Sequence, residues 1–213
     1  MKKIIVVGAG VSGLAAAVRL QKLGYDVTLY EKEGQPGGKM NQIKENGFTF
    51  DVGPTIVMMP EIYREVFEFA GVDPNDYIPM EKVDPMLQLY FAQDEPLTFS
   101  NDLVELTKTL EAISEEDAQG YFAFLADIYK RYVIAKESFI TKSFRTWRDF
   151  YNPKSLWAGL KLRTFSDAYS SISKFVKDDR LRKSLAFQTL YIGVSPYQGP
   201  SLYTIIPMIE LMY

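Results

Sequence analysis

Near its start the sequence reads Ile4-Ile5-Val6-Val7-Gly8-Ala9-Gly10-Val11-Ser12-Gly13. The first four of these residues form a β-branched apolar run that ends at a glycine, which favours a strand buried on both faces of a sheet. Apolar residues then recur at helical spacing from Leu14 to Leu20, and Gly24 lies where such a helix should end. A second strand is expected over residues 27–30, directly before Glu31. The order strand, glycine turn, helix, strand predicts the first βαβ unit of a Rossmann-type domain.

The turn matches the pattern G-x-G-x-x-G, and each glycine has a separate physical role. Gly8 permits the tight turn out of the strand, Gly10 lets a pyrophosphate approach the backbone, and Gly13 lets the helix press against the sheet. Phosphates at this point would meet free backbone amides and the positive end of the helix dipole. We therefore count Ala9 and Ser12, together with the three glycines, as candidate cofactor-binding residues.

An acidic residue completes the pattern, because Glu31 follows Gly13 by 18 residues. A carboxylate at this distance can accept hydrogen bonds from a ribose 2′-hydroxyl, and it would repel a 2′-phosphate. The glycine pattern alone is weak evidence, but here the strand, the helix and the acidic residue accompany it. The sequence thus predicts a dinucleotide site that includes Glu31, against the alternative of a glycine-rich turn without a ligand.

A second glycine-rich loop follows and reads Lys32-Glu33-Gly34-Gln35-Pro36-Gly37-Gly38-Lys39. A glycine pair lets the backbone bend back toward a bound group, and Lys39 adds a cation beside it. A plain dehydrogenase does not need this loop, whereas a flavin nucleotide lying over the first helix would use it. We expect Lys32, Gly38 and Lys39 to contact the cofactor; the alternative is a surface loop with a solvated lysine.

A third segment adds two weaker candidates. Residues 48–52 alternate between aromatic or apolar and polar side chains, which predicts a short strand. A Gly-Pro turn ends this strand at Gly53, and its amides would lie near a cofactor as the chain runs into Thr55. Gly53 and Thr55 therefore join the list of candidate cofactor-binding residues.

The composition limits the chemistry that the chain can perform. Of its 213 residues 47% are hydrophobic and 24% charged, so the chain is globular, and a net charge of −3 gives no indication of nucleic-acid binding. It contains no cysteine and no histidine, which excludes disulfides, thiolate chemistry and Ser-His-Asp catalysis, and we expect no metal site. Proton transfer within the chain must use Asp, Glu, Lys, Tyr or water. The spacing of these residues does not single out a catalytic group.

The motifs together resemble the flavin amine oxidase superfamily and, within it, the carotenoid and phytoene desaturases. The early part of the resemblance is carried by Glu31, Gly37-Gly38-Lys39 and Gly47-Phe48-Thr49-Phe50-Asp51-Val52-Gly53-Pro54-Thr55. The later part is carried by Phe187-Gln188-Thr189-Leu190-Tyr191-Ile192-Gly193 and Gly199-Pro200-Ser201-Leu202-Tyr203-Thr204-Ile205-Ile206-Pro207-Met208-Ile209-Glu210. These segments look most like the bacterial C30 branch, the dehydrosqualene (4,4′-diapophytoene) desaturases.

The resemblance covers nearly the whole chain, and it implies a fold and an activity. The fold would be α/β, with a Rossmann-type FAD-binding core and an inserted, largely helical substrate domain. The activity would be FAD-dependent desaturation of a C30 isoprenoid hydrocarbon, from 4,4′-diapophytoene to 4,4′-diaponeurosporene. The second FAD-contacting region of the family is absent, so we expect this chain to be the N-terminal part of a longer protein.

The remaining sequence suggests how the chain is divided. We expect residues 1–75 to form the first part of the FAD-binding domain and residues 76–213 to form an incomplete, mostly helical substrate region. Helices are expected over residues 60–71, from a cap at Ser100 or Asn101 to residue 113, from Ser114 to residue 138, from Ser166 to residue 176 and from Asp178 to residue 187. Strands are expected over 86–91 and 97–99, around a turn at Asp94-Glu95-Pro96.

Residues 139–162 have a different texture, since aromatic side chains alternate with lysines and arginines. This mixture suits the surface of an anionic membrane, and its alternative is an amphipathic helical pair with solvated cations. The chain begins with a core strand, which leaves no room for a signal peptide, and has no run of about 18 apolar residues. We expect a cytoplasmic protein, with a peripheral position on the inner face of the cell membrane as the membrane alternative.

Two other functions stay open at this point. One is a different flavin oxidoreductase of the same superfamily, acting on an amine or a porphyrinogen. The other is a prenyl-lipid-binding escort protein of the same fold, which needs no flavin. The sequence also leaves open the number of desaturation steps, the terminal electron acceptor and the oligomeric state.

Overall fold

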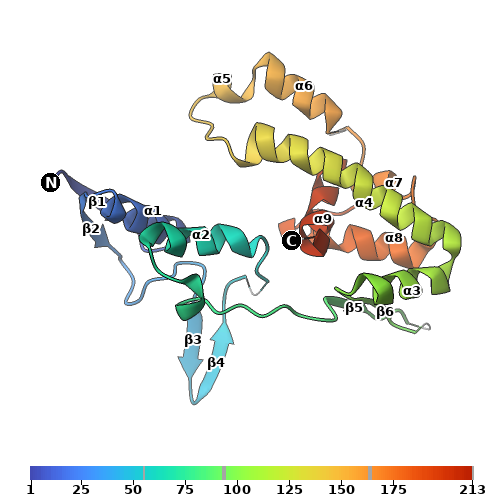
Figure 1. Ribbon diagram of the computed structural model, residues 1–213, viewed down its shortest axis with the longest axis horizontal. Helices are drawn as coiled ribbons and strands as arrows, with labels where there is room; N and C mark the ends of the chain where they lie inside the picture. The colour runs from blue at the N-terminus through green and yellow to red at the C-terminus, as the bar shows by residue number, and fades with distance from the viewer. Residues whose placement is uncertain (55, 93–94, 163–164, 213) are drawn as a thin grey trace. The chain divides into compact units, whose positions relative to one another are not determined.

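The computed structural model describes residues 1–54, 56–92, 95–162 and 165–212 and divides into two compact units (Figure 1). The first unit comprises residues 1–81 and the second residues 82–213. The division that the sequence suggests, after residue 75, falls within the short 3₁₀ helix η1 (Pro74–Asp76) of the first unit. Thr55 and Asp94 lie outside the described residues.

The first unit begins with the expected βαβ arrangement. Strand β1 (Lys3–Val7) pairs in parallel with β2 (Asp26–Tyr30), and helix α1 (Val11–Lys22) connects the two strands. Helix α1 ends just before Gly24, whose φ of 87° is in the left-handed region that glycine adopts without strain. The prediction of a Rossmann-type α/β fold is therefore confirmed.

One expectation about this sheet is wrong. Strand β1 is not buried on both faces, because Ile5 is 66% exposed and Val7 is 84% exposed. Their neighbours Ile4 and Val6 are less exposed, so burial alternates along the strand. Among the described residues β1 pairs with β2 alone. An apolar run therefore predicts a strand that is buried on both faces only where other parts of the protein cover both faces of its sheet.

A hairpin precedes the second helix of the first unit. Strand β3 (Gln42–Glu45) pairs antiparallel with β4 (Phe48–Asp51), and the two-residue turn is Asn46-Gly47. Both turn residues have positive φ angles, 50° for Asn46 and 83° for Gly47. An Asn-Gly pair with this geometry is typical of a tight hairpin turn, because it follows the natural twist of the strands. The second strand was expected, whereas β3 was not.

Helix α2 (Pro60–Ala70) begins with proline and ends at Gly71, as predicted from the sequence. It packs against α1 through its polar side chains as well as its apolar ones. The Arg19 guanidinium lies 3.0 Å from a Glu65 carboxylate oxygen, and Lys22 donates a hydrogen bond of 2.8 Å to the carbonyl of Ala70. These contacts join α2 to α1, the helix that follows the glycine turn, so they help to fix the position of α1.

The second unit is mostly helical. It contains a small hairpin of β5 (Leu87–Leu89) and β6 (Leu97–Phe99), followed by α3 (Leu103–Ile113) and the long helix α4 (Glu115–Ala135), which extends into a π-helical turn η2 (Lys136–Ile140). The later helices are α5 (Trp147–Phe150), α6 (Pro153–Lys161), α7 (Ala168–Ile172), α8 (Asp179–Ala186), η3 (Phe187–Ile192), η4 (Ser201–Thr204) and α9 (Ile205–Met212). Among the described residues, no helix is both long enough and apolar enough to cross a bilayer.

The core of the second unit is organised on α4, which runs along the other helices of the unit in Figure 1. Tyr121, Phe124, Ile128 and Tyr132 have 0–1% exposure and recur every three or four residues, so they form one continuous stripe. Gly120 lies beside this stripe at a close crossing, because a Cβ atom there would lie 1.9 Å from the carbonyl oxygen of Phe175.

Two of the expected helix caps are wrong by one or two residues. Helix α3 is capped by Asp102, not by Ser100 or Asn101, since Asp102 accepts hydrogen bonds of 2.8 Å and 3.0 Å from the amides of Val104 and Glu105. Ser100 instead donates its hydroxyl to Asp84.

Likewise α7 is capped by Asp167, not by Ser166, and it ends at Ile172. The caps at Ser114 and Asp178 are as predicted. At both α3 and α7 the cap is an aspartate that directly follows the predicted residue.

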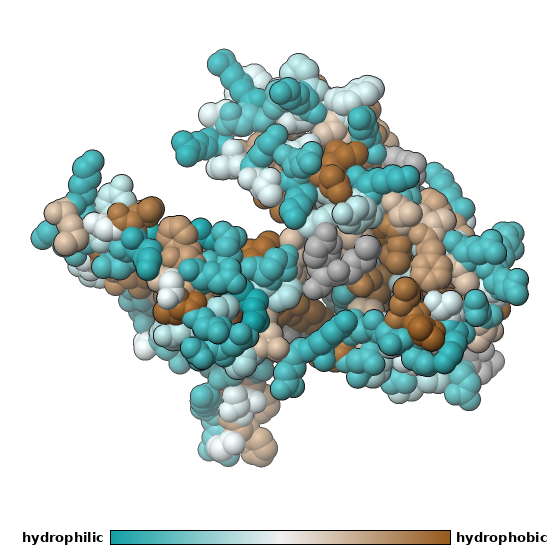
Figure 2. All heavy atoms as spheres, viewed as in Figure 1, coloured by the Kyte–Doolittle hydropathy of each residue, from teal (hydrophilic) through white to brown (hydrophobic). Residues whose placement is uncertain are grey.

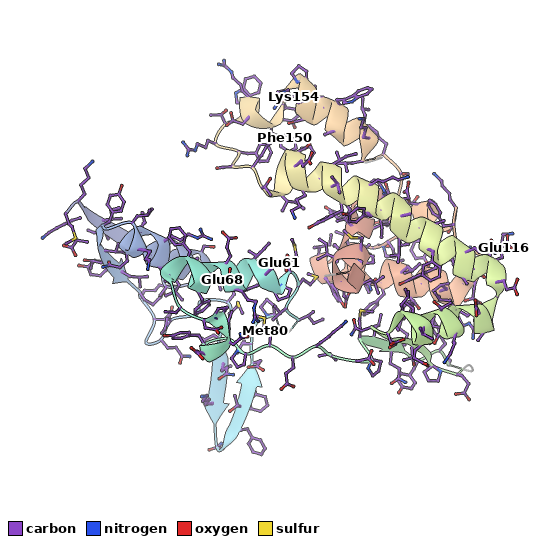
Figure 3. All side chains as sticks on the ribbon, in the orientation of Figure 1. Glu61, Glu68, Met80, Glu116, Phe150 and Lys154 are labelled. Carbon is purple, nitrogen blue, oxygen red and sulfur yellow. The ribbon has the colours of Figure 1, made fainter. Side chains whose placement is uncertain are left out.

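The start of α4 is tied to the loop before α8. The carboxylate of Asp117 accepts hydrogen bonds from the amides of Lys177 and Asp178, at 2.5 Å and 3.2 Å. Beside it, Glu116 forms an ion pair of 2.5 Å with the side chain of Lys177; Figure 3 shows Glu116 at the N-terminal end of α4. Asp117 is buried, so these bonds satisfy a charge that burial alone would destabilise.

Candidate dinucleotide-binding site

The glycine turn between β1 and α1 has the backbone geometry that a pyrophosphate site requires. Gly8 has a φ of 98°, and its amide donates a hydrogen bond of 2.7 Å to the carbonyl of Tyr30 at the end of β2. A Cβ atom on Gly13 would lie 1.9 Å from the carbonyl oxygen of Gly8, so only glycine allows the helix to start this close to the strand. A Cβ atom on Gly10 would meet nothing within 4 Å. The space beside Gly10 is therefore open.

The N-terminus of α1 presents backbone amides to this open space. Gly10 is the cap residue, and no described side chain makes a capping hydrogen bond there. The first amides of any α-helix have no intrahelical acceptor, and here they include those of Val11, Ser12 and Gly13. The first turn of α1 also carries no acidic residue that would repel an anion. These features fit a bound diphosphate.

Glu31 lies against the same turn. One carboxylate oxygen accepts a hydrogen bond of 2.6 Å from the Ala9 amide, and the other accepts one of 3.0 Å from the Glu33 amide. The hydrogen bond from Glu33 and then that from Ala9 lower the pKa of the Glu31 carboxyl below its usual value. Glu31 is thus an anion held within hydrogen-bonding distance of the glycine turn, which fits recognition of a ribose hydroxyl.

The second glycine-rich loop returns to the first. The Gly37 amide donates a hydrogen bond of 2.8 Å to the carbonyl of Ala9, and Gly37 forms a parallel bridge with Gly10. Gly37 and Gly38 have φ angles of 124° and 59°, which favour glycine at both positions. A Cβ atom on Gly38 would lie 3.2 Å from Cα of Gly10. Gly38 is therefore placed directly beside the glycine turn.

The far side of this loop borders a cavity of about 650 Å³. The cavity is lined by Gln35, Gly38, Lys39, Asn41, Gln42, Ile43, Val52, Gly53 and Pro54. Gly53 lies close to the backbone of the loop, because a Cβ atom there would be 2.1 Å from the carbonyl oxygen of Lys39. Three residues chosen from the sequence, Gly38, Lys39 and Gly53, thus share one cavity wall.

Two other candidate residues, Ser12 and Lys32, have exposed side chains. Ser12 is exposed in the first turn of α1. The ammonium group of Lys32 pairs with Glu33 at 3.2 Å, and its side chain is 87% exposed, so no described contact directs it toward the glycine turn.

Two groups that contact the glycine turn were not among the site residues predicted from the sequence. These are Gly37, which bonds to Ala9 directly, and the carbonyl of Tyr30, which holds Gly8. The glycine pair was a visible signal for Gly37, whereas a backbone carbonyl leaves no signal in a sequence.

Comparison with known proteins agrees with this geometry. Residues 6–71 match the family of NAD(P)-binding Rossmann-like domains. A putrescine oxidase solved with putrescine bound superposes with a TM-score of 0.52, covering 96% of this chain and 40% of that one at 16% identity. At this identity the likeness concerns the fold alone. The chain therefore has a Rossmann-like domain over residues 6–71 and is similar in fold to part of a putrescine oxidase.

Relatives with much higher sequence identity indicate a more specific family. The chain is 50% identical over 210 residues to the 4,4′-diapophytoene desaturase (4,4′-diaponeurosporene-forming) of Staphylococcus haemolyticus, and 48% identical over 211 residues to that of Staphylococcus aureus strain Newman. Each alignment covers 99% of this chain and 42% of the relative, so the chain spans about two-fifths of their length. The chain is a homologue of the N-terminal part of bacterial carotenoid desaturases, which confirms the resemblance found in its motifs.

Proposed function

We propose that this chain is the cofactor- and substrate-binding part of an FAD-dependent desaturase that converts 4,4′-diapophytoene into 4,4′-diaponeurosporene. The observation that carries the proposal is the glycine turn with an anionic Glu31 at its amide, in a chain 50% identical to such a desaturase. In this proposal residues 1–75 hold FAD and residues 76–213 bind the hydrocarbon.

The first unit would bind the cofactor through its backbone more than through its side chains. The amides of Gly10, Ser12 and Gly13 and the positive end of α1 would hold the pyrophosphate, while the Ala9 amide holds Glu31 beside the turn. Glu31 would bind the ribose that lies nearest to the turn. The loop around Gly38 and Lys39, with Gly53 and Thr55, would border the rest of the cofactor, and exposed Lys32 would contribute charge alone.

When bound, FAD supplies the two-electron chemistry of the reaction. The protein must therefore position a hydrocarbon that offers no polar group, and it must exclude water around it. The apolar residues of the second unit are suited to this task. Amine oxidation is less well supported, since the match to an amine oxidase has 16% identity and the match to desaturases has 50%.

The test is a segment exchange in which this chain replaces the matching N-terminal part of the S. haemolyticus enzyme. We expect the chimera to turn cells that make 4,4′-diapophytoene yellow, as the parent enzyme does, because the chain carries the cofactor and substrate determinants. The matched control is the same chimera with Gly10→Val, which should fold and leave the cells colourless. Colourless cells from a chimera that is expressed and binds flavin would contradict the proposal.

A second part of the proposal concerns residues 139–162, which we propose to be a membrane-contacting surface. Trp147 and Trp157 are 68% and 61% exposed, and each has a cation 5.4 Å from its ring centroid, from Arg148 and Lys161 respectively. Tyr151, which follows α5, and Leu156 and Leu160 on α6 are also exposed. Figure 2 shows this region as a mixture of hydrophilic and pale side chains, as expected where cations alternate with tryptophan and tyrosine.

An aromatic cluster forms part of this surface. The rings of Phe139, Phe144 and Phe150 lie 5.5–6.2 Å apart, and those of Phe144 and Phe150 are 36% and 45% exposed; Figure 3 labels Phe150 and the nearby cation Lys154. Amphipathic aromatic rings prefer the headgroup region, and each cation near an anionic surface contributes about 1 kcal/mol. A peripheral position on the membrane would give the enzyme access to an insoluble substrate.

Vesicle sedimentation tests this surface. We expect the chimera to pellet with vesicles that contain anionic lipid at low salt, and we expect the double variant Trp147→Ala with Trp157→Ala to remain in the supernatant. Tyr90→Ala removes an equally exposed aromatic residue elsewhere in the second unit and should have no effect. Equal pelleting of all three proteins would contradict the proposal.

A further inference from the structure

Asn41 lies directly before strand β3 in the first unit, and the protein holds its side chain through the oxygen atom. The Oδ1 atom accepts a hydrogen bond of 2.6 Å from the side-chain amide of Gln35 and one of 2.7 Å from the backbone amide of Gln42. The backbone of Asn41 is fixed as well, because its carbonyl accepts a hydrogen bond of 2.9 Å from the amide of Val52. Asn41 therefore has a set position at the start of the β3–β4 hairpin.

These partners decide which way the carboxamide of Asn41 is turned. A backbone N–H group can only donate a hydrogen bond, so the atom that meets the Gln42 amide must be the oxygen of Asn41. The NH2 group is then the other branch of the carboxamide, and it makes no hydrogen bond with a described residue. Asn41 is half-buried, and its nitrogen is not sealed from solvent. The side chain thus offers a donor of fixed orientation to a bound molecule.

Asn41 belongs to the wall of the cavity of about 650 Å³ that Gly38, Lys39 and Gly53 also line. Two further cavities, of about 710 Å³ and 630 Å³, border the same loop, and Asn41 and Gln35 line all three. Because protein donors already occupy the oxygen of Asn41, the group that a ligand can use is the NH2 group.

The charges around these cavities indicate which ligand atoms fit. Among the described residues that line the 650 Å³ cavity, Lys39 is the one charged residue, so no carboxylate lies in that wall. The carboxylates of Asp51 and Glu33 instead line the other two cavities. An ammonium group and an NH2 group are both donors, and they favour a ligand that carries several oxygen acceptors.

The 650 Å³ cavity is continuous with the glycine turn through Gly38. This residue lines the cavity, and a Cβ atom on it would lie 3.2 Å from Cα of Gly10. Glu31 bonds to Ala9 in the same turn but lines none of the three cavities. If the turn binds the diphosphate of FAD and Glu31 binds its adenosine ribose, the other half of the dinucleotide is left for this cavity.

We propose that Asn41 binds the flavin half of FAD, with its NH2 group donating a hydrogen bond to an oxygen of the ribityl chain or of the flavin ring. This inference rests on the proposed function for the identity of the cofactor. Gln35 and the backbone amide of Gln42 are positioning groups, since they hold the oxygen of Asn41 and thereby orient its NH2 group. The site then distinguishes FAD from ADP, which lacks the flavin half.

The test compares the affinities of the chimera for FAD and for ADP by isothermal titration calorimetry. Asn41→Asp keeps the oxygen to which Gln35 and Gln42 donate, and it replaces the NH2 donor by a negatively charged acceptor. We expect this variant to bind FAD at least about tenfold more weakly and to bind ADP within about twofold of the wild type. Asn46→Asp adds the same charge to the same hairpin, outside all three cavities, and should change neither affinity.

A second variant, Asn41→Ala, removes the donor without adding a charge, and it decides the test if Asn41→Asp melts at a lower temperature than the wild type without FAD. We expect it to bind FAD about fivefold more weakly and ADP unchanged. FAD affinities within about twofold of the wild type in both variants, or equal losses for FAD and ADP, would overturn the inference. A wild-type chimera that binds FAD but makes no desaturated product would instead contradict the proposed function, and the affinities would still test Asn41.

Discussion

The two units of this protein achieve their structure in different ways. Among the described residues of the first unit only Ala9 and Pro74 are buried, whereas the second unit buries a continuous set of large side chains along α4. The first unit depends on backbone contacts between glycines, such as those of Gly8, Gly13 and Gly37. Both differences agree with the proposed function, in which the first unit would bind phosphates through accessible amides and the second would bury a hydrocarbon against apolar surface.

The contrast predicts different responses to the same substitution, glycine to alanine. In the first unit Gly13→Ala places a Cβ atom 1.9 Å from the Gly8 carbonyl, so the turn must open. We expect a loss of more than about 4 kcal/mol in the free energy of unfolding of this unit, measured by thermal melting. Gly10→Ala is the control, because its Cβ meets nothing within 4 Å, and its melting should match the wild type. Equal stability of the two variants would contradict the conclusion that close backbone contacts at Gly13 hold the first unit together.

In the second unit the corresponding position is Gly120 on α4. Alanine there would place a Cβ atom 1.9 Å from the Phe175 carbonyl, which pushes the α7–α8 loop away from α4. We expect a destabilisation of about 3 kcal/mol from overpacking, with unfolding of the helical core detected by near-ultraviolet circular dichroism.

Gly159 on α6 provides the matched helical control for this variant. Its Cβ would meet nothing within 4 Å, so Gly159→Ala should stabilise the helix by up to about 1 kcal/mol. A destabilising Gly159→Ala would show that helix propensity does not limit α6.

Asp117 gives the second unit a dependence on pH. Burial alone would raise its pKa, but the hydrogen bonds from the amides of Lys177 and Asp178 outweigh burial and lower the pKa below the ordinary value. A lowered folded-state pKa means that Asp117 stabilises the protein above about pH 4, the ordinary aspartate value, and that this contribution is lost as pH falls through the folded-state pKa.

Asp117→Asn should therefore cost about 2 kcal/mol at pH 7 and less at pH 3. Urea unfolding at the two pH values measures this difference. If Asp117→Asn lowered the free energy of unfolding equally at pH 7 and pH 3, the charge of the carboxylate would not be the cause of the stabilisation.

The smallest expected effect concerns a helix cap. Asp102→Ala removes the acceptor of the Val104 and Glu105 amides and should cost about 1 kcal/mol, whereas Asp102→Asn should keep most of the cap. Chemical unfolding of the two variants measures the difference. If alanine and asparagine were equivalent, the corrected position of this cap would be unsupported.

Much of the first unit could be predicted from its sequence, because a backbone that approaches another backbone requires glycine. The spacing of Gly8, Gly10 and Gly13 and the distance to Glu31 therefore carry structural information directly. Strand β3 was missed because its residues are polar and exposed; its pairing depends on the Asn46-Gly47 turn and on β4. The exposure of Ile5 and Val7 could not be predicted, since an apolar run does not reveal how many faces of a strand are covered.

The second unit was predicted less completely, because its contacts join residues distant in sequence. The periodicity of α4 and the cap at Ser114 were visible, whereas the contact of Gly120 with Phe175 and the bonds from Asp117 to residues 177 and 178 leave no local pattern. The same is true of the hydrogen bond that the Tyr191 hydroxyl of η3 donates to Glu210 of α9.

The most direct test of the account is the affinity of the chimera for FAD, compared between wild type and Gly10→Val. Valine at residue 10 would place side-chain atoms where the structure leaves the backbone open, and its Cβ atom would meet nothing within 4 Å. We predict that the wild-type chimera binds FAD tightly and that Gly10→Val melts at the same temperature but binds FAD at least about tenfold more weakly, a loss of about 1.4 kcal/mol. Equal affinity for FAD in the two proteins would contradict the assignment of this turn as the cofactor site.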